Sequence, residues 1–163
     1  MTQGSGDALA SFEMEYPSRF RRHKSVPKHD VLIFSRSCGI ADPRQDFLYL
    51  TGYNNVTDNT YKGVAKYGAE GYLEDLPLLN IGRTSHACAG YFDTHGHFVL
   101  VVMGGMGMDV GAFGVLSSTE AFTLGVSTSW KQFYPLPEQL LDLRAATVDN
   151  QIFLFGGKVI HQY

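Results

Sequence analysis

Three short apolar runs, each ending in glycine, recur along the chain at equal spacing. The runs occupy residues 47–52, 98–105 and 152–157. Their first glycines, Gly52, Gly104 and Gly156, each lie 52 residues apart. A period near 50 residues is typical of repeat architectures in which every repeat is one supersecondary unit. We therefore predict that the chain is built from repeats.

The composition of the runs indicates what each repeat contains. Residues 98–103 are apolar at every position, which predicts a strand buried on both faces. The mixed runs around Tyr67 and Phe122 are typical of strands with one face in water. Glycine directly after the apolar strand permits a positive φ where the chain turns. Each period therefore predicts a small sheet of several short strands.

The pattern also predicts the boundaries. We expect residues 1–30 to be an N-terminal leader, flexible or contributing an extra strand near 12–16, and residues 31–163 to be the repeat region. The repeats are expected at 31–80, 81–138 and, partially, 139–163. Their strands are predicted near 34–41, 47–52, 61–67, 70–76, 83–92, 97–104, 117–123, 129–134, 143–149 and 151–156.

One stretch of the chain resembles a blade of the kelch-repeat β-propellers. The resemblance rests on Arg83-Thr-Ser-His86-Ala87, the double glycine at 104–105, the segment 118–122, and Trp130 followed by Leu136-Pro137. It implies an all-β fold, a partial kelch-type β-propeller of four-stranded antiparallel blades. The residues that it marks as structural are Gly52, Gly104, Gly105, Gly156, Gly157, Arg83, His86, Arg144 and Trp130.

Within this resemblance, Arg144 is expected to take the place of Arg83 one repeat later. Arg83 and His86 are expected to hydrogen-bond the backbone of the adjacent blade. About two and a half blades are expected, whereas closed propellers have typically 4–8. Apolar surface should therefore be exposed at the ends, for further blades or another copy to cover.

Charge and cysteine content narrow the function classes. A net charge of -3 provides no overall attraction to nucleic acid or an anionic membrane, so neither is an expected partner. No basic segment followed by an apolar run begins the sequence, which favours a cytoplasmic location, with the nucleus as the alternative because of the basic run at 19–24. Cys38 and Cys88 are expected to be buried or half-buried thiols.

Motifs for catalysis or cofactors are weak. Gly105, Gly107 and Gly111 have the wrong spacing for a dinucleotide-binding loop. His95 and His97 could ligate a metal, but Gly96 between them predicts a solvent-exposed turn. No motif for a nucleophile elbow or a zinc protease occurs. We expect no cofactor and no enzymatic activity.

The predicted function is protein–protein interaction through loops between second and third strands. Their amide, carboxylate, aromatic and methionine groups suit protein recognition. The candidate residues are Tyr53, Asn54, Asn55, Asp58, Met106, Met108, Asp109 and Phe113. By resemblance the chain would belong to a substrate receptor or a cytoskeletal adaptor. The alternatives are a fragment of a secreted carbohydrate-active or copper oxidase propeller and a truncated product without independent function.

Overall fold

The fold is all-β. A computed structural model describes residues 12–15, 19–22, 32–33, 36–55, 58–68, 73–109 and 111–159, and these contain strands and no helix. Every strand pair is antiparallel. Within the described part of the chain, no helix has the length and apolar character needed to cross a membrane.

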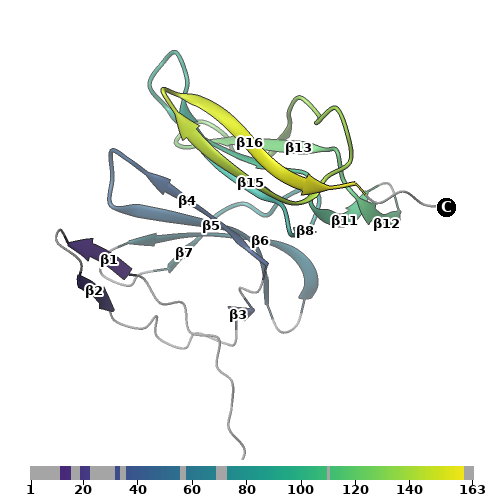
Figure 1. Cartoon of the computed structure of the whole chain (residues 1–163), viewed down its shortest axis with the longest axis horizontal. Helices are drawn as coiled ribbons and strands as arrows, with labels where there is room; N and C mark the ends of the chain where they lie inside the picture. The colour runs from purple at the N-terminus through teal and green to yellow at the C-terminus, as the bar shows by residue number, and fades with distance from the viewer. Residues whose placement is uncertain are drawn as a thin grey trace, which may run out of the picture.

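Three sheets follow one another along the chain (Figure 1). Sheet 1 contains β4 (Cys38–Asp42), β5 (Phe47–Asn55), β6 (Asp58–Gly68) and β7 (Leu73–Asp75), with β3 (Leu32–Ile33) paired to the end of β5. Sheet 2 contains β9 (Ala87–Phe92), β10 (Phe98–Met103), β13 (Thr119–Thr123) and β14 (Lys131–Gln132). Sheet 3 contains β15 (Leu141–Val148) and β16 (Gln151–Lys158).

Two smaller groups of strands complete the fold. A hairpin of β11 (Met106–Asp109) and β12 (Ala112–Val115) extends beyond β10 and pairs with β8 (Arg83–Thr84). β1 (Phe12–Glu15) pairs with β2 (Arg19–Arg22) inside the range predicted as a leader. β1 lies where an extra strand was expected near 12–16, and the flexibility of the leader stays a prediction.

The predicted burial of residues 98–103 on both faces is confirmed. All six side chains of β10 are no more than 5% exposed. Phe98, Leu100 and Val102 pack against sheet 1, whereas Val99 and Val101 pack on the side of sheet 3. Sheet 2 is therefore the middle layer, and its central strand has no face for water.

The same contacts join sheet 1 to sheet 2 and sheet 2 to sheet 3. The amide of Ser85 donates to the carbonyl of Arg36 at 3.3 Å, and the amide of Asp142 donates to the carbonyl of Ser85 at 2.9 Å. All three residues have positive φ although none is glycine. One hydrogen bond thus links equivalent positions of successive sheets.

Glycine makes the close approach of the sheets possible. Gly52 and Gly104 have φ of 75° and 62°, and a Cβ on either would lie 2.6 Å from a carbonyl oxygen of the segment that enters the next sheet. That oxygen belongs to Arg83 for Gly52 and to Leu140 for Gly104. A side chain at either glycine would separate the sheets.

These contacts correct the predicted position of Arg144 in the repeat. Arg83 and Leu140 are equivalent, since each offers its carbonyl to the glycine of the preceding sheet. Arg144 pairs with Phe155 as Ala87 pairs with Met103, so Arg144 corresponds to Ala87. The turn between β15 and β16 (residues 149–150) is shorter than the turn between β9 and β10 (residues 93–97), and this difference shifts the sequence match by several residues.

Arg83 is fully buried, and its guanidinium bonds residues that flank or belong to β10 and β13 of sheet 2, where contact with the backbone of the adjacent blade was predicted. Its Nη1 donates to the carbonyls of Gly104 and Ser118, both at 2.9 Å. Its Nη2 donates to Glu120 Oε1 at 2.8 Å, forming an ion pair that is almost fully buried. Glu120 in turn accepts the amides of Asn80 and Ile81. The network fixes the segment that enters sheet 2.

Trp130 also binds the segment that connects sheet 1 to sheet 2. It is 3% exposed, and its ring lies 5.5 Å from that of Phe122. Its indole nitrogen donates to the carbonyl of Pro77 at 2.8 Å, and its own carbonyl accepts Asn80 Nδ2. The connection between sheets 1 and 2 is therefore attached to the outer strands of sheet 2.

The prediction of two thiols is wrong. Cys38 of β4 and Cys88 of β9 form a disulfide with a Cα–Cα distance of 5.9 Å. The bond joins the first strands of sheets 1 and 2, which pack against each other. A near-repeat separation of 50 residues is the one signal in the sequence that places the two cysteines in adjacent sheets.

Loss of the disulfide should lower the free energy of unfolding by about 4 kcal/mol, because it closes a loop of 50 residues. The measurement is urea unfolding of the wild type with and without a reductant. The double variant Cys38→Ser, Cys88→Ser is the control and should not respond to the reductant. Equal unfolding midpoints for reduced and oxidised wild type would contradict the expectation.

Substituting Glu120→Gln should lower the free energy of unfolding by about 3–5 kcal/mol, because Arg83 then keeps a buried charge without its counter-ion. Glu74→Gln is the matched control. It breaks the exposed pair with Lys66 (3.5 Å) and should cost less than about 1 kcal/mol. Similar losses from the two variants would show that the Arg83 charge is not desolvated.

Candidate binding site at the ends of the first strands

Two hollows lie at opposite ends of β4, β9 and β15, the first strands of the three sheets. We call the one at their beginnings the arginine hollow, and its volume is about 590 Å³. It is lined by Arg36, Ser37, Cys38, Gly39, Ser85, His86, Met106, Leu141, Asp142 and Arg144. The neutral hollow, at the other ends, has about 400 Å³.

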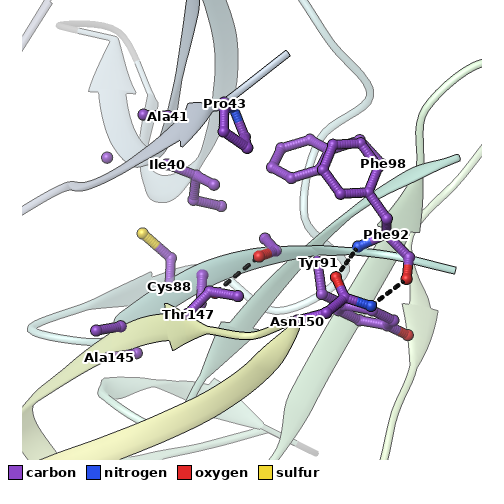
Figure 2. A pocket seen from close by; sticks show the side chains of 14 residues that line it. Ile40, Ala41, Pro43, Cys88, Tyr91, Phe92, Phe98, Ala145, Thr147 and Asn150 are labelled. Atoms are coloured by element: carbon purple, nitrogen blue, oxygen red, sulfur yellow. Dashed lines mark hydrogen bonds between the residues drawn. The ribbon is translucent and has the colours of Figure 1, made fainter. Parts of the chain in front are cut away.

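The neutral hollow exists because the first strands carry small residues (Figure 2). Its floor contains Gly39, Ala89 and Ala145, and no charged side chain lines it. Figure 2 shows Thr147 and Asn150 of sheet 3 directed at β9. They bond the carbonyl of Gly90 and both backbone groups of Phe92, all at 2.7 Å. The polar side chains around this hollow therefore serve to hold sheet 3 on sheet 2.

The arginine hollow differs because it is charged. Arg36, just before β4, and Arg144 of β15 are both exposed and line it. Asp142 provides the negative charge in the lining, and its carboxylate accepts Lys158 Nζ at 3.0 Å. That hydrogen bond is the main reason that the pKa of Asp142 is lowered, with a further hydrogen bond from Ser85. Counting Lys158, positive charge prevails at this end of the molecule.

His86 is the buried polar group of the arginine hollow. Its Nε2 lies 2.8 Å from Thr51 Oγ1 of the neighbouring sheet, a side-chain contact where a backbone contact was predicted. Its Nδ1 has no hydrogen-bond partner among the described residues. Burial, together with the charge of Arg83, lowers its pKa from 6.5 to about 3. The imidazole is therefore neutral at physiological pH and serves as a packing group between two sheets.

An apolar surface borders the arginine hollow. Successive residues of a strand point to opposite faces, and cross-strand partners share a face. Met106 and Met108 of β11 therefore share one face of the hairpin with their partners Val115 and Phe113. We call these four residues the apolar hairpin face; Met108 is 62% and Phe113 67% exposed. Met106 also lines the hollow, so the two features are continuous.

The opposite face of the hairpin explains this orientation. Gly107 and Gly114 are cross-strand partners there, and Gly107 is pressed against the carbonyl of Gly82. No side chain would fit in that contact. This face therefore packs inward at Gly107, whereas the space beside Gly114 is open, and the Met108 and Phe113 side chains on the other face are exposed.

The predicted loop residues thus divide into two groups. Those at 106–113 lie in a hairpin and not in a loop, and Met106, Met108 and Phe113 reach its solvent face. The side chain of Asp109 lies outside the described residues. Those near 53–58 are also strand residues, because β5 and β6 continue to the turn. They form an extended hairpin.

Tyr53 is not available to a partner as predicted. It is 7% exposed, and its hydroxyl donates to Asp75 Oδ1 at 2.7 Å. Burial and this carboxylate raise its pKa. The side chains of Asn54, Asn55 and Asp58 lie outside the described residues, so their predicted role is untested. Sequence reasoning did not identify Arg36 and Arg144 as residues of one binding site. They line the same hollow only because the first strands of the sheets lie side by side.

The predicted turn at His95 and His97 is present. Asp93 accepts the amides of both histidines at 2.9 Å, and its second oxygen lies 3.2 Å from His97 Nδ1. These hydrogen bonds lower the pKa of Asp93. Asp42 caps the equivalent turn of sheet 1 through the amide of Arg44. The aspartates therefore have matching roles in consecutive hairpins.

Comparisons with known proteins support the fold. No protein-family model matches the sequence, and no curated protein matches it. Among solved structures, the chain is similar to that of YjhT, with a TM-score of 0.58 and 18% identity over 76% of this chain. The chain spans about a third (34%) of that protein. A likeness at this identity shows the arrangement of strands alone.

Stability should decrease as the pH falls from 6.5 toward 3 because of His86. The unfolded state takes up a proton in this range and the folded state does not, so the free energy of unfolding falls by up to about 1.4 kcal/mol per pH unit. Above pH 6.5 the effect is absent. The measurement is urea unfolding across this range for the wild type and for His86→Gln, whose slope should be smaller. His95→Gln, an exposed control, should keep the wild-type slope.

Proposed function

We propose that this chain is part of a kelch-type β-propeller that binds a protein partner. Support comes from the repeated junction between sheets, in which one hydrogen bond and one glycine contact recur at equivalent positions. Repetition of one junction rotates each sheet equally from the last, as radial stacking requires. Sheet 2 with its four strands, and β4 to β7 of sheet 1, serve as blades in this proposal, and sheet 3 as half of a blade.

The observation that carries the binding role is the continuity of the arginine hollow with the apolar hairpin face. Arginine, methionine and aromatic side chains are enriched in protein interfaces, and anchors in hollows contribute most of the binding energy. Met106 belongs to both features, so one ligand can contact both. The partner that fits is a peptide segment with an acidic side chain for the hollow and an apolar one for the hairpin.

The charges support an acidic segment. Arg36 and Arg144 are exposed in the lining, whereas Asp142 is already engaged by Lys158 and Ser85. A guanidinium binds a carboxylate through two parallel hydrogen bonds. His86, neutral by burial, adds no positive charge to that of the two arginines.

The disulfide bears on the location of this function. Disulfides persist in oxidising compartments and are rare in the cytosol. The cytoplasmic location indicated by the sequence stays a prediction, and the bond between Cys38 and Cys88 favours an oxidising compartment instead.

Peptides selected from a random library on the immobilised wild-type chain should be enriched in Asp and Glu beside an apolar residue. Their affinity should fall about tenfold or more on Arg144→Ala and on Phe113→Ala, because each removes one anchor. The measurement is fluorescence anisotropy with labelled peptides.

Two variants serve as controls for that experiment. Lys131→Ala removes an exposed cation on β14, and Val126→Ala removes an apolar side chain that is 59% exposed. Both lie outside the lining of the hollow and should leave the affinity unchanged. Neutral selected peptides, or equal losses from all four variants, would refute the proposed site.

A further inference from the structure

The disulfide between Cys38 and Cys88 is added to a junction whose counterpart has no such bond. The junction of sheet 2 with sheet 3 has the same glycine contact and the same backbone hydrogen bond as that of sheet 1 with sheet 2. By strand register, Ala87 and Ala145 occupy in it the places of Cys38 and Cys88. The two alanines pack in one apolar cluster. Opening of the disulfide therefore leaves the contacts on which the other junction depends.

The two cysteines differ in access. Cys38 is half-buried and lines the arginine hollow. Cys88 belongs to the apolar core between sheets 1 and 2 and is 4% exposed, although it lies at the border of the neutral hollow (Figure 2). A small thiol that enters the arginine hollow therefore reaches Cys38 before Cys88.

The charges of the arginine hollow select the kind of thiol that enters it. Arg36 lies two residues before Cys38, and Arg144 lines the hollow from β15; both are exposed. The carboxylate of Asp142 is already paired with Lys158 at 3.0 Å. Positive charge attracts an anionic thiol and favours the thiolate, which is the form that attacks a disulfide. The neutral hollow has no charged side chain in its lining and offers no such attraction.

From this arrangement we propose that the Cys38–Cys88 disulfide is a site of thiol exchange for small acidic thiols, which reach Cys38 through the arginine hollow. The carboxylates of the thiol bind Arg36 and Arg144, and its thiolate attacks Cys38 Sγ. A new sulfur–sulfur bond forms at Cys38 as the bond to Cys88 breaks. Cys88 Sγ leaves with the electron pair and takes up the proton that the thiol lost. One mixed disulfide replaces one disulfide, so no oxidant or reductant is consumed.

The fold keeps the exchange reversible. The glycine contact and the hydrogen bond from Ser85 to Arg36 hold β4 beside β9, so Cys88 stays next to the mixed disulfide. It can attack Cys38 again when the thiol is removed, because the reaction is then intramolecular. The bound adduct places its carboxylates between the two arginines and so excludes an acidic peptide. That last consequence rests on the proposed function, whereas the exchange itself does not.

The experiment compares three thiols on the folded full chain: glutathione, which carries carboxylates, 2-mercaptoethanol, which is neutral, and cysteamine, which is cationic. Rate constants are compared at equal thiolate concentration, and early samples are trapped by alkylation. Glutathione should react about tenfold faster than cysteamine, because the hollow concentrates anions. The difference should shrink in about 1 M salt, which screens the charges. Peptide mass spectrometry should find glutathione on Cys38 and the alkyl label on Cys88.

Variants of the full chain test the role of the arginines. Arg36→Gln and Arg144→Gln should each slow the reaction with glutathione about threefold, since each removes one exposed charge that attracts the carboxylates. The reaction with 2-mercaptoethanol should keep its rate in both variants. Lys131→Gln removes an exposed cation on β14, outside the hollow, and should leave the rate constants of all three thiols unchanged.

Three results would overturn the proposal. An adduct on Cys88 would place the entry of the thiol in the neutral hollow. Equal rate constants for the three thiols would show that exchange takes place on an opened chain, in which the hollow no longer exists. No exchange at all would show that Cys38 is out of reach. Peptide binding does not enter the experiment, so a failure of the proposed function would leave these results unchanged.

Discussion

The structure depends on how closely one sheet approaches the next. Gly52 and Gly104 allow a carbonyl of the following sheet to lie where a Cβ would be. This approach brings the apolar faces into contact, so that both sides of β10 are buried. It also brings Ser85 within hydrogen-bond distance of Arg36, and Asp142 within reach of Ser85. The hollows are a consequence, because the first strands meet with small side chains between them.

The buried ion pair between Arg83 and Glu120 is tolerated because both of its members are hydrogen-bonded. Arg83 occupies a position where burial alone would be costly, and its guanidinium is satisfied by two carbonyls and Glu120. Glu120 also accepts hydrogen bonds from two backbone amides of the segment that enters sheet 2, and so fixes the position of that segment. The end of that segment supports the apolar hairpin face through Gly82 and Gly107. A buried ion pair is thus connected, contact by contact, to the exposed surface that is proposed to bind a partner.

The two proposals use one hollow in different ways. The arginine hollow offers charge and shape at the beginnings of three strands, with Arg36 and Arg144 contributed by different sheets. As a peptide site it would select a partner by its carboxylate. As a site of thiol exchange it brings the same charges to the disulfide, through Cys38 in its lining. Both depend on the meeting of the first strands, because Cys38 and Arg144 belong to different sheets.

The amino-acid sequence by itself determined the period, the all-β fold and the doubly buried strand at 98–103, because these follow from local alternation and from the spacing of Gly52, Gly104 and Gly156. The tertiary structure decided which side chains meet across sheets. The disulfide between Cys38 and Cys88 and the displacement of Arg144 from the position of Arg83 depend on register between distant strands. Local patterns carry no information on that register, since the same alternation fits several alignments of one sheet on the next.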